Sequence, residues 1–127
     1  MAKAALKVGI MPREQYVQRT LAIARGEYVP RAGEPKIWFE SIKSLAEVLS
    51  EQNRQLLALI ELHRPQSLYE LEQLSGRKAP NLSRTLKTLE AHGLVELRKE
   101  HRRVIPRARA TRFQVELNLS SDNGAAC

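Results

Sequence analysis

Two short runs of leucine at helical spacing, separated by one glycine, constrain the fold of this chain most strongly. The first run lies within residues 68–74 and the second within residues 82–89, with Gly76 between them. Leucines three or four residues apart share one face of an α-helix, so each run predicts a short amphipathic helix. The glycine permits the positive φ of a tight turn, and the two helices are expected to pack together at a steep angle. The leucines expected to form this core are Leu68, Leu71, Leu74, Leu82, Leu86 and Leu89.

The residues around this helix pair predict its neighbours. Ser67 and Glu70 have the S-x-x-E spacing of a capping box, which starts the first helix of the pair. An earlier helix is expected to end at Pro65, and the second helix of the pair, residues 79–91, ends before Gly93. After this glycine the apolar period becomes that of extended chain, and a basic segment interrupts two such stretches. The sequence therefore predicts three helices followed by an antiparallel hairpin.

The first forty residues are expected to fold as one helix and one strand. Pro12 is suited to the start of a helix and Gly26 to its end. Residues 36–40 are rich in β-branched and aromatic types, which predicts a short strand. Residues 112–119 alternate apolar and polar side chains, which predicts a last strand. Residues 1–10 contain lysines but no sustained apolar run, so we expect no secretory signal there.

Positive charge is concentrated in one part of the chain. The net charge is +7, and residues 77–112 hold 11 lysines and arginines against 3 glutamates, while the remaining residues are nearly balanced. A uniformly basic chain would indicate solubility or loose adhesion, whereas one basic block is typical of a surface that binds a polyanion. The outer face of helix 79–91 and the basic segment both fall in this block. The sequence therefore predicts that both contact double-stranded DNA.

The side chains on the outer face of helix 79–91 suit the edges of base pairs. Arginine forms paired hydrogen bonds with guanine, and asparagine does so with adenine, so Arg84 and Asn81 are the candidates for base contacts. Basic residues at the helix entrance are expected to hold phosphates, and the hairpin tip 99–103 to reach the DNA backbone or minor groove. The predicted DNA-binding residues are Arg77, Lys78, Asn81, Ser83, Arg84, Thr85, Lys87, Thr88, Lys99, His101, Arg102 and Arg103.

Each of these assignments has a plainer alternative. Arg84 and Lys87 are compatible with an ordinary solvated helix face, Asn81 with a helix cap, and residues 99–103 with a soluble hairpin tip. Structured RNA is a weaker alternative partner, because the same charges suit any phosphate backbone. The chain has six aromatic residues and none lies on the expected contact face, so recognition of single strands by stacking is not favoured.

The sequence holds no recognisable catalytic or metal-binding constellation. His63, His92 and His101 do not share a helix face at ligand spacing, and Asp122 and Cys127 are the sole residues of their types. There is no glycine-rich phosphate loop. We therefore expect no enzyme activity, no cofactor and no metal. A single cysteine and the absence of an apolar run of about 20 residues fit a cytoplasmic, nucleoid-associated protein with no membrane partner.

Several of these segments resemble a known family. Residues 67–71, 75–77, 81–90 and 93–95 are similar to MarR-type winged-helix transcriptional regulators, and especially to a small prokaryotic subgroup. In that subgroup a Trp-Phe-Glu-Ser-type segment precedes the winged helix, as residues 38–41 do here. The resemblance implies a winged helix-turn-helix and a role in transcription. Members of the subgroup lie beside toxin genes, which implies an antitoxin as a further possibility.

The larger MarR proteins end in a long dimerisation helix that this chain lacks after its hairpin. Dimerisation is therefore assigned, as a hypothesis, to the helix around residues 16–24. The predicted fold class is mainly α with a small antiparallel β-wing, that is, a winged helix-turn-helix with an extra N-terminal helix. Residues 1–40 would form a dimerisation or partner-binding extension, residues 41–119 the DNA-binding domain and residues 120–127 a disordered tail.

The function predicted from the sequence is sequence-specific binding of double-stranded DNA by a homodimer that represses its own operon. The alternative is an antitoxin that neutralises a partner toxin, with residues 1–40 and the tail as the binding surface. The two roles are compatible, because autorepressing antitoxins bind both DNA and toxin. A small open reading frame beside the gene would favour the antitoxin.

Overall fold

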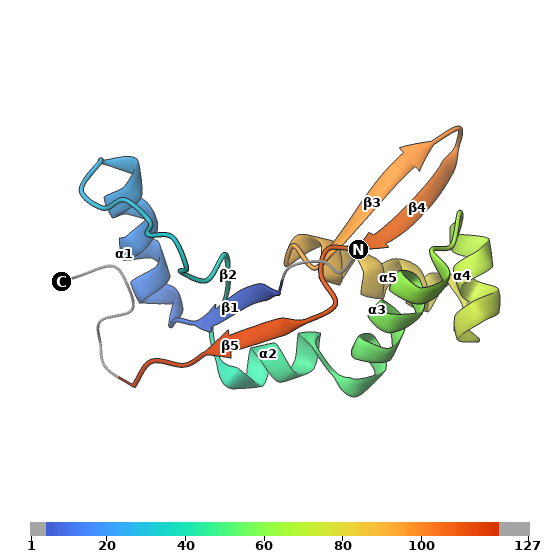
Figure 1. Ribbon diagram of the computed structural model, residues 1–127, viewed down its shortest axis with the longest axis horizontal. Helices are drawn as coiled ribbons and strands as arrows, with labels where there is room; N and C mark the ends of the chain where they lie inside the picture. The colour runs from blue at the N-terminus through green and yellow to red at the C-terminus, as the bar shows by residue number, and fades with distance from the viewer. Residues whose placement is uncertain (1–4, 120–127) are drawn as a thin grey trace. The chain divides into compact units, whose positions relative to one another are not determined.

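The computed structural model describes residues 5–119, which contain five helices and five strands (Figure 1). The predicted tail, residues 120–127, lies outside the described residues, together with Asp122 and Cys127. None of the helices between residues 5 and 119 combines the length and apolar character needed to cross a membrane. In chain order the elements are β1 (Leu6–Ile10), α1 (Arg13–Ala24), β2 (Ile37–Phe39), α2 (Ile42–Val48), α3 (Glu51–His63), α4 (Leu68–Ser75), α5 (Ala79–Ala91), β3 (Val95–Glu100), β4 (Arg103–Ala108) and β5 (Phe113–Glu116).

The fold class predicted from the sequence is wrong. The chain is not a mainly α winged helix-turn-helix with an extra N-terminal helix, but a mixed α/β protein. Strand β1 is the centre of a parallel three-stranded sheet in the order β2-β1-β5, and β3 and β4 form a separate antiparallel pair. Val8 is in register with Ile37 on one side and with Val115 on the other. The prediction missed this sheet because its strands lie far apart in the sequence, where no local pattern reveals their pairing.

The described chain forms two compact units. Residues 5–46 and 112–119 form the N-terminal unit, and residues 47–111 form what we call the basic unit. The sequence analysis grouped residues 112–119 with the segment that begins at residue 41. The structure instead places β5 in the sheet of the N-terminal unit, because its backbone pairs with β1.

In the N-terminal unit, the central strand and its nearest neighbours form the core. An aromatic ring lies directly on the backbone of Gly9, where an added Cβ would be 2.5 Å from Trp38 Cζ3 and 2.9 Å from Pro35 Cγ. The glycine is therefore required by this close approach and not by an unusual φ. The fully or nearly buried apolar side chains of this unit include Val8, Ile10, Met11 and Phe39.

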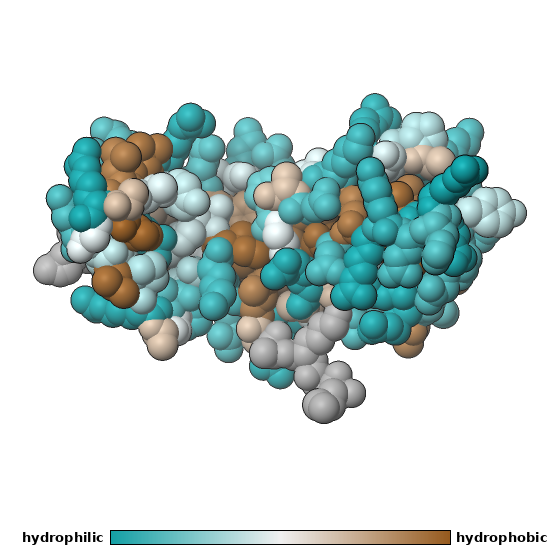
Figure 2. All heavy atoms as spheres, turned by 90° about the horizontal axis from the view of Figure 1, so that it is seen from above, coloured by the Kyte–Doolittle hydropathy of each residue, from teal (hydrophilic) through white to brown (hydrophobic). Residues whose placement is uncertain are grey.

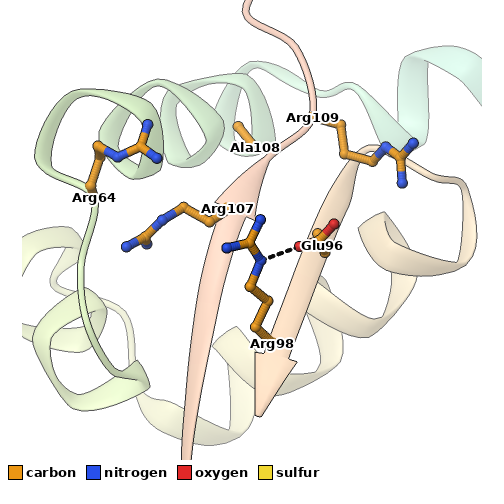
Figure 3. Close-up of a pocket in the computed structure, with 6 residues that line it drawn as sticks. All are labelled: Arg64, Glu96, Arg98, Arg107, Ala108 and Arg109. Atoms are coloured by element: carbon orange, nitrogen blue, oxygen red, sulfur yellow. Dashed lines mark hydrogen bonds and ion pairs between the residues drawn. The ribbon is translucent and has the colours of Figure 1, made fainter. Parts of the chain in front are cut away.

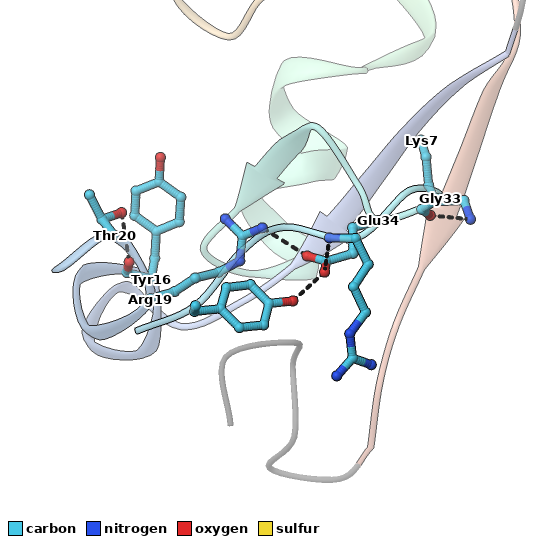
Figure 4. A network of polar contacts seen from close by, with 8 residues as sticks. Lys7, Tyr16, Arg19, Thr20, Gly33 and Glu34 are labelled. Atoms are coloured by element: carbon cyan, nitrogen blue, oxygen red, sulfur yellow. Dashed lines mark hydrogen bonds and ion pairs between the residues drawn. The ribbon is translucent and has the colours of Figure 1, made fainter. Parts of the chain in front are cut away.

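A buried arginine fixes the loop that follows α1 (Figure 4). Arg19 is 7% exposed, and its Nη2 donates to Glu34 Oε1 at 2.8 Å. Its guanidinium carbon lies 5.6 Å from the centroid of the Tyr28 ring and 5.2 Å from that of the Trp38 ring. The Tyr28 hydroxyl and the Arg31 N–H also donate to Glu34. Burial of the carboxylate opposes its ionisation, but these hydrogen bonds outweigh it and lower the pKa of Glu34. The lowered pKa favours the ionised carboxylate, which accepts these hydrogen bonds and holds the loop against the helix.

In the basic unit, α3, α4 and α5 pack with the β3–β4 hairpin: α3 contacts β4, α5 contacts β3 and α4 contacts both α5 and β4. Four of the six predicted core leucines are buried, namely Leu71, Leu82, Leu86 and Leu89. Leu68 is half-buried, and Leu74 is wrongly predicted because it is 39% exposed. These two residues lie at opposite ends of the eight-residue helix α4, so packing encloses its centre and not its ends.

The close approach at Gly9 predicts the effect of a single methyl group. We expect Gly9→Ala to lower the free energy of unfolding by about 1–3 kcal/mol, because the new Cβ overlaps the Trp38 ring. Urea denaturation followed by circular dichroism measures this change. In a Trp38→Leu background the same substitution should cost less, since the Trp38 ring atoms are removed and only the overlap with Pro35 Cγ remains. Equal costs in both backgrounds would contradict the explanation.

Candidate nucleic-acid interface

Helix α5 presents a polar face to solvent. Its buried leucines, which include Leu86, lie on one side of the helix, and the periodicity of an α-helix places the exposed polar residues on the opposite side. Ser83 and Thr85 are half-buried and lie on the flanks of this face. The structure thus separates the six residues predicted on the helix into two groups. The exposed group comprises Asn81, Arg84, Lys87 and Thr88.

Asn81 and Arg84 form a linked pair on this face. Arg84 Nη2 donates to Asn81 Oδ1 at 2.6 Å, and Thr88 Oγ1 donates to the carbonyl of Arg84 at 3.1 Å. The N-cap residue of α5 is Lys78, so Asn81 lies inside the first turn and does not cap the helix. This excludes the alternative role proposed for Asn81 from the sequence. The pair presents an amide and a guanidinium side by side, the two groups that suit adenine and guanine edges.

The two basic residues at the entrance of α5 differ in their surroundings. Arg77 is half-buried, and its Nη2 donates to the carbonyl of Gln52 on α3 at 2.7 Å. Lys78 is exposed, and the following amide, that of Ala79, donates to Glu72 Oε2 at 3.0 Å. Arg77 therefore connects α5 to α3, while Lys78 is the entrance residue whose charge faces solvent.

The hairpin tip exposes four basic or titratable side chains, and its closed end projects away from the three helices (Figure 1). Because Glu100 pairs with Arg103, only two residues form the turn. These residues, His101 and Arg102, have φ values of 50° and 70°. A two-residue turn with two positive φ values usually carries Asn-Gly, since larger residues are strained there. His101 and Arg102 instead place two larger side chains at these strained positions. The four exposed residues of the tip are Lys99, His101, Arg102 and Arg103.

The α5 face and the hairpin tip belong to elements that contact each other, because β3 packs against α5 and carries Lys99 near its far end. The structure therefore joins the two groups of predicted residues within one unit. Among the residues the structure describes, no group of three or more histidine, cysteine, aspartate or glutamate side chains is arranged to hold a metal ion.

The sequence analysis missed a second basic cluster, at the base of the hairpin. A cavity of about 300 Å³ is lined by side chains from both hairpin strands and from the end of α3 (Figure 3). None of its residues was predicted as a site residue. Finding it requires the strand register that places Arg107 opposite Glu96, which the sequence alone does not give. The lining residues are Arg64, Glu96, Arg98, Arg107, Ala108 and Arg109.

Comparison with known proteins gives one match. The family model described as HVO_A0114 matches residues 48–115, more than half of the chain and nearly all of the basic unit. Searches of curated proteins and of solved structures found no significant match. The comparisons give no support to the resemblance to MarR-type regulators, which stays a prediction.

The strain at the hairpin turn leads to a stability prediction. We expect the double variant His101→Asn/Arg102→Gly to raise the free energy of unfolding by about 1–2 kcal/mol, because Asn-Gly adopts two positive φ values readily. Thermal denaturation measures the change. Arg103→Gln is the control: it removes a neighbouring exposed cation without a positive φ, and should shift stability by less than about 0.5 kcal/mol. A less stable double variant would contradict the turn assignment.

Proposed function

We propose that this protein, which belongs to the HVO_A0114 family, binds double-stranded DNA and regulates transcription. The observation that carries the proposal is the exposed face of α5, where the Asn81–Arg84 pair lies beside Lys87. The major groove of B-DNA is wide enough for an α-helix, and each base pair presents its own donors and acceptors there. A helix with paired amide and guanidinium groups on its outer face is suited to that groove.

The contacts divide into those that read bases and those that bind phosphates. Arg84 and Asn81 supply the base contacts, because their donors and acceptors match base edges. Lys78 and Lys87 bind phosphates beside the groove, and the cations of the hairpin tip contact the backbone or minor groove further along. Phosphate contacts give affinity that falls with salt, whereas the base contacts give sequence preference.

Binding is proposed to take place at the DNA upstream of the protein's own gene, with repression as its result. Fluorescence anisotropy with the upstream duplex and a shuffled duplex, across a salt series, tests this. A preference of ~10³-fold or more for the upstream duplex supports an autoregulator. Equal affinities that fall steeply with salt would indicate non-specific DNA binding. The absence of binding to both duplexes at low salt would overturn the proposal.

The N-terminal unit carries the surface proposed for self-association. Five apolar or aromatic side chains of this unit are 43–53% exposed: Tyr16, Val17 and Leu21 on α1, and Val115 and Leu117 in or just after β5. Hydrophobic areas lie over the part of this unit that contains α1 and the loop after it (Figure 2). We propose a second copy of the chain as the partner, because a symmetric dimer reads two DNA half-sites. A toxin is the alternative partner, as the antitoxin hypothesis requires.

The division of roles on α5 predicts different effects for two neighbouring substitutions. Arg84→Ala should reduce the discrimination between upstream and shuffled DNA by about 1–3 kcal/mol, because a base contact is lost. Lys87→Ala should weaken binding to both duplexes equally and lower the slope of log affinity against log salt by about 0.9, because a phosphate contact is lost. Anisotropy titrations of both variants measure these quantities. Unchanged discrimination in Arg84→Ala would contradict the base-reading role.

The apolar face of α1 predicts the effect of a charge placed on it. Leu21→Glu should convert the dimer to a monomer in sedimentation equilibrium, because the carboxylate loses its hydration in an apolar contact. Gln114→Glu is the control. Gln114 is an exposed polar residue of β5, and its side chain points to the face of the strand opposite that of its neighbour Val115. A wild-type chain that is monomeric at about 10 μM would contradict self-association through this face.

A further inference from the structure

The cavity at the hairpin base, which we call the arginine pocket, collects positive charge from three elements (Figure 3). Arg64 follows the end of α3, Arg98 lies on β3 and Arg107 on β4. Their side chains lie along the same side of the hairpin, while the side chain of Arg109 extends away from the other three. Glu96 is the acidic residue of the lining, and its Oε1 already accepts a hydrogen bond from Arg98 Nε.

Arg107 is fixed in place by the backbone around it. Its Nη1 donates to the carbonyls of Pro65 and Pro106, both at 2.7 Å, and the side chain is half-buried. Burial, followed by the positive charges of Arg64 and Arg98, lowers the pKa of Arg107. The carboxylates of Glu100 and Glu61 act on this pKa in the opposite direction but are outweighed. The guanidinium is thus held at a fixed position near two like charges, and an anion placed between the three arginines would reduce their repulsion.

Arg64 occupies a backbone position that normally carries glycine or asparagine. It is the C-cap of α3, with φ 46° and ψ 61°, in the left-handed region. Its amide donates to the carbonyl of Ile60 at 2.9 Å, which any residue type provides. The contact of its side chain with Glu61 is long, 3.9 Å, and more than half of the side chain is exposed. Helix termination therefore does not require an arginine side chain here, and the guanidinium of Arg64 has only this long ion pair at the edge of the pocket.

We propose that the arginine pocket binds a phosphate group through Arg64, Arg98 and Arg107. Guanidinium groups form paired, charge-assisted hydrogen bonds with phosphate oxygens, and their rigid planes suit a shaped pocket. The lining contains no residue of α5, so the pocket is distinct from the face proposed to read base pairs. The phosphate belongs either to a small phosphorylated molecule or to a DNA backbone. The inference does not depend on the proposed function, because a small phosphorylated molecule would bind the pocket in the absence of DNA.

The test uses inorganic pyrophosphate as the probe, titrated into the full chain by isothermal calorimetry at low ionic strength. Arg64→Asn removes the guanidinium but places a favoured residue in the left-handed position, so the variant should fold at least as stably as the natural chain. We expect its affinity for pyrophosphate to fall tenfold or more. Arg13→Asn is the control, because Arg13 is an exposed arginine of the N-terminal unit.

A duplex titration separates the two sources of phosphate. One outcome is that pyrophosphate binds without displacing duplex DNA, and that Arg64→Asn weakens pyrophosphate binding while Arg13→Asn does not. This outcome supports the proposal with a small phosphorylated molecule as the ligand. If Arg64→Asn instead lowers the salt slope of duplex binding by about 0.9 and Arg13→Asn does not, it is supported with a backbone phosphate as ligand. If the two variants bind both probes alike, the proposal is overturned.

Discussion

Strand β1 has partners on both of its edges, and the organisation of the chain depends on these two pairings. One partner, β2, is separated from β1 by α1 and its loop, while the other, β5, follows the whole basic unit. Parallel strands always need a crossover connection, and here the second crossover is a folded unit of its own. The basic unit, residues 47–111, is therefore inserted into the N-terminal unit and is attached to it at both ends. The hydrogen bonds between β1 and β5 close this long loop, whose entropic cost grows only slowly with length.

The sequence predicted the elements of the basic unit because their signals are local. Leucine spacing fixed the buried side of α5, and Gly76 has the positive φ of 74° expected of the turn. The exposed position of Arg84 followed from the same spacing. The end of α4 was less predictable, because the exposure of Leu74 depends on where its neighbours stop. Local periodicity therefore gives the side of a helix that is buried, but not how far along the helix the burial extends.

The parallel sheet and the arginine pocket were not predictable in this way. Leu6 and Val8 alternate with polar or small residues, a strand pattern that the prediction did not use, and neither neighbour of β1 follows it directly in sequence. The pocket depends on cross-strand register and on the end of α3, which together bring Arg64 and Arg107 to one cavity. Both features arise from residues far apart in the chain, and pairing over such distances is fixed by the tertiary structure as a whole.

The hydrogen bond between Asn81 and Arg84 has a consequence for the proposed base contacts. An isolated arginine on a helix surface samples many rotamers and loses about 2 kcal/mol of rotamer entropy when it is fixed. Here the asparagine restrains the guanidinium before any ligand arrives, so part of that entropy is already lost in the free protein. The two residues consequently act as one preorganised unit. A substitution at either position also releases the other, which would make their effects on the proposed base contacts non-additive and would favour changes that occur as a pair.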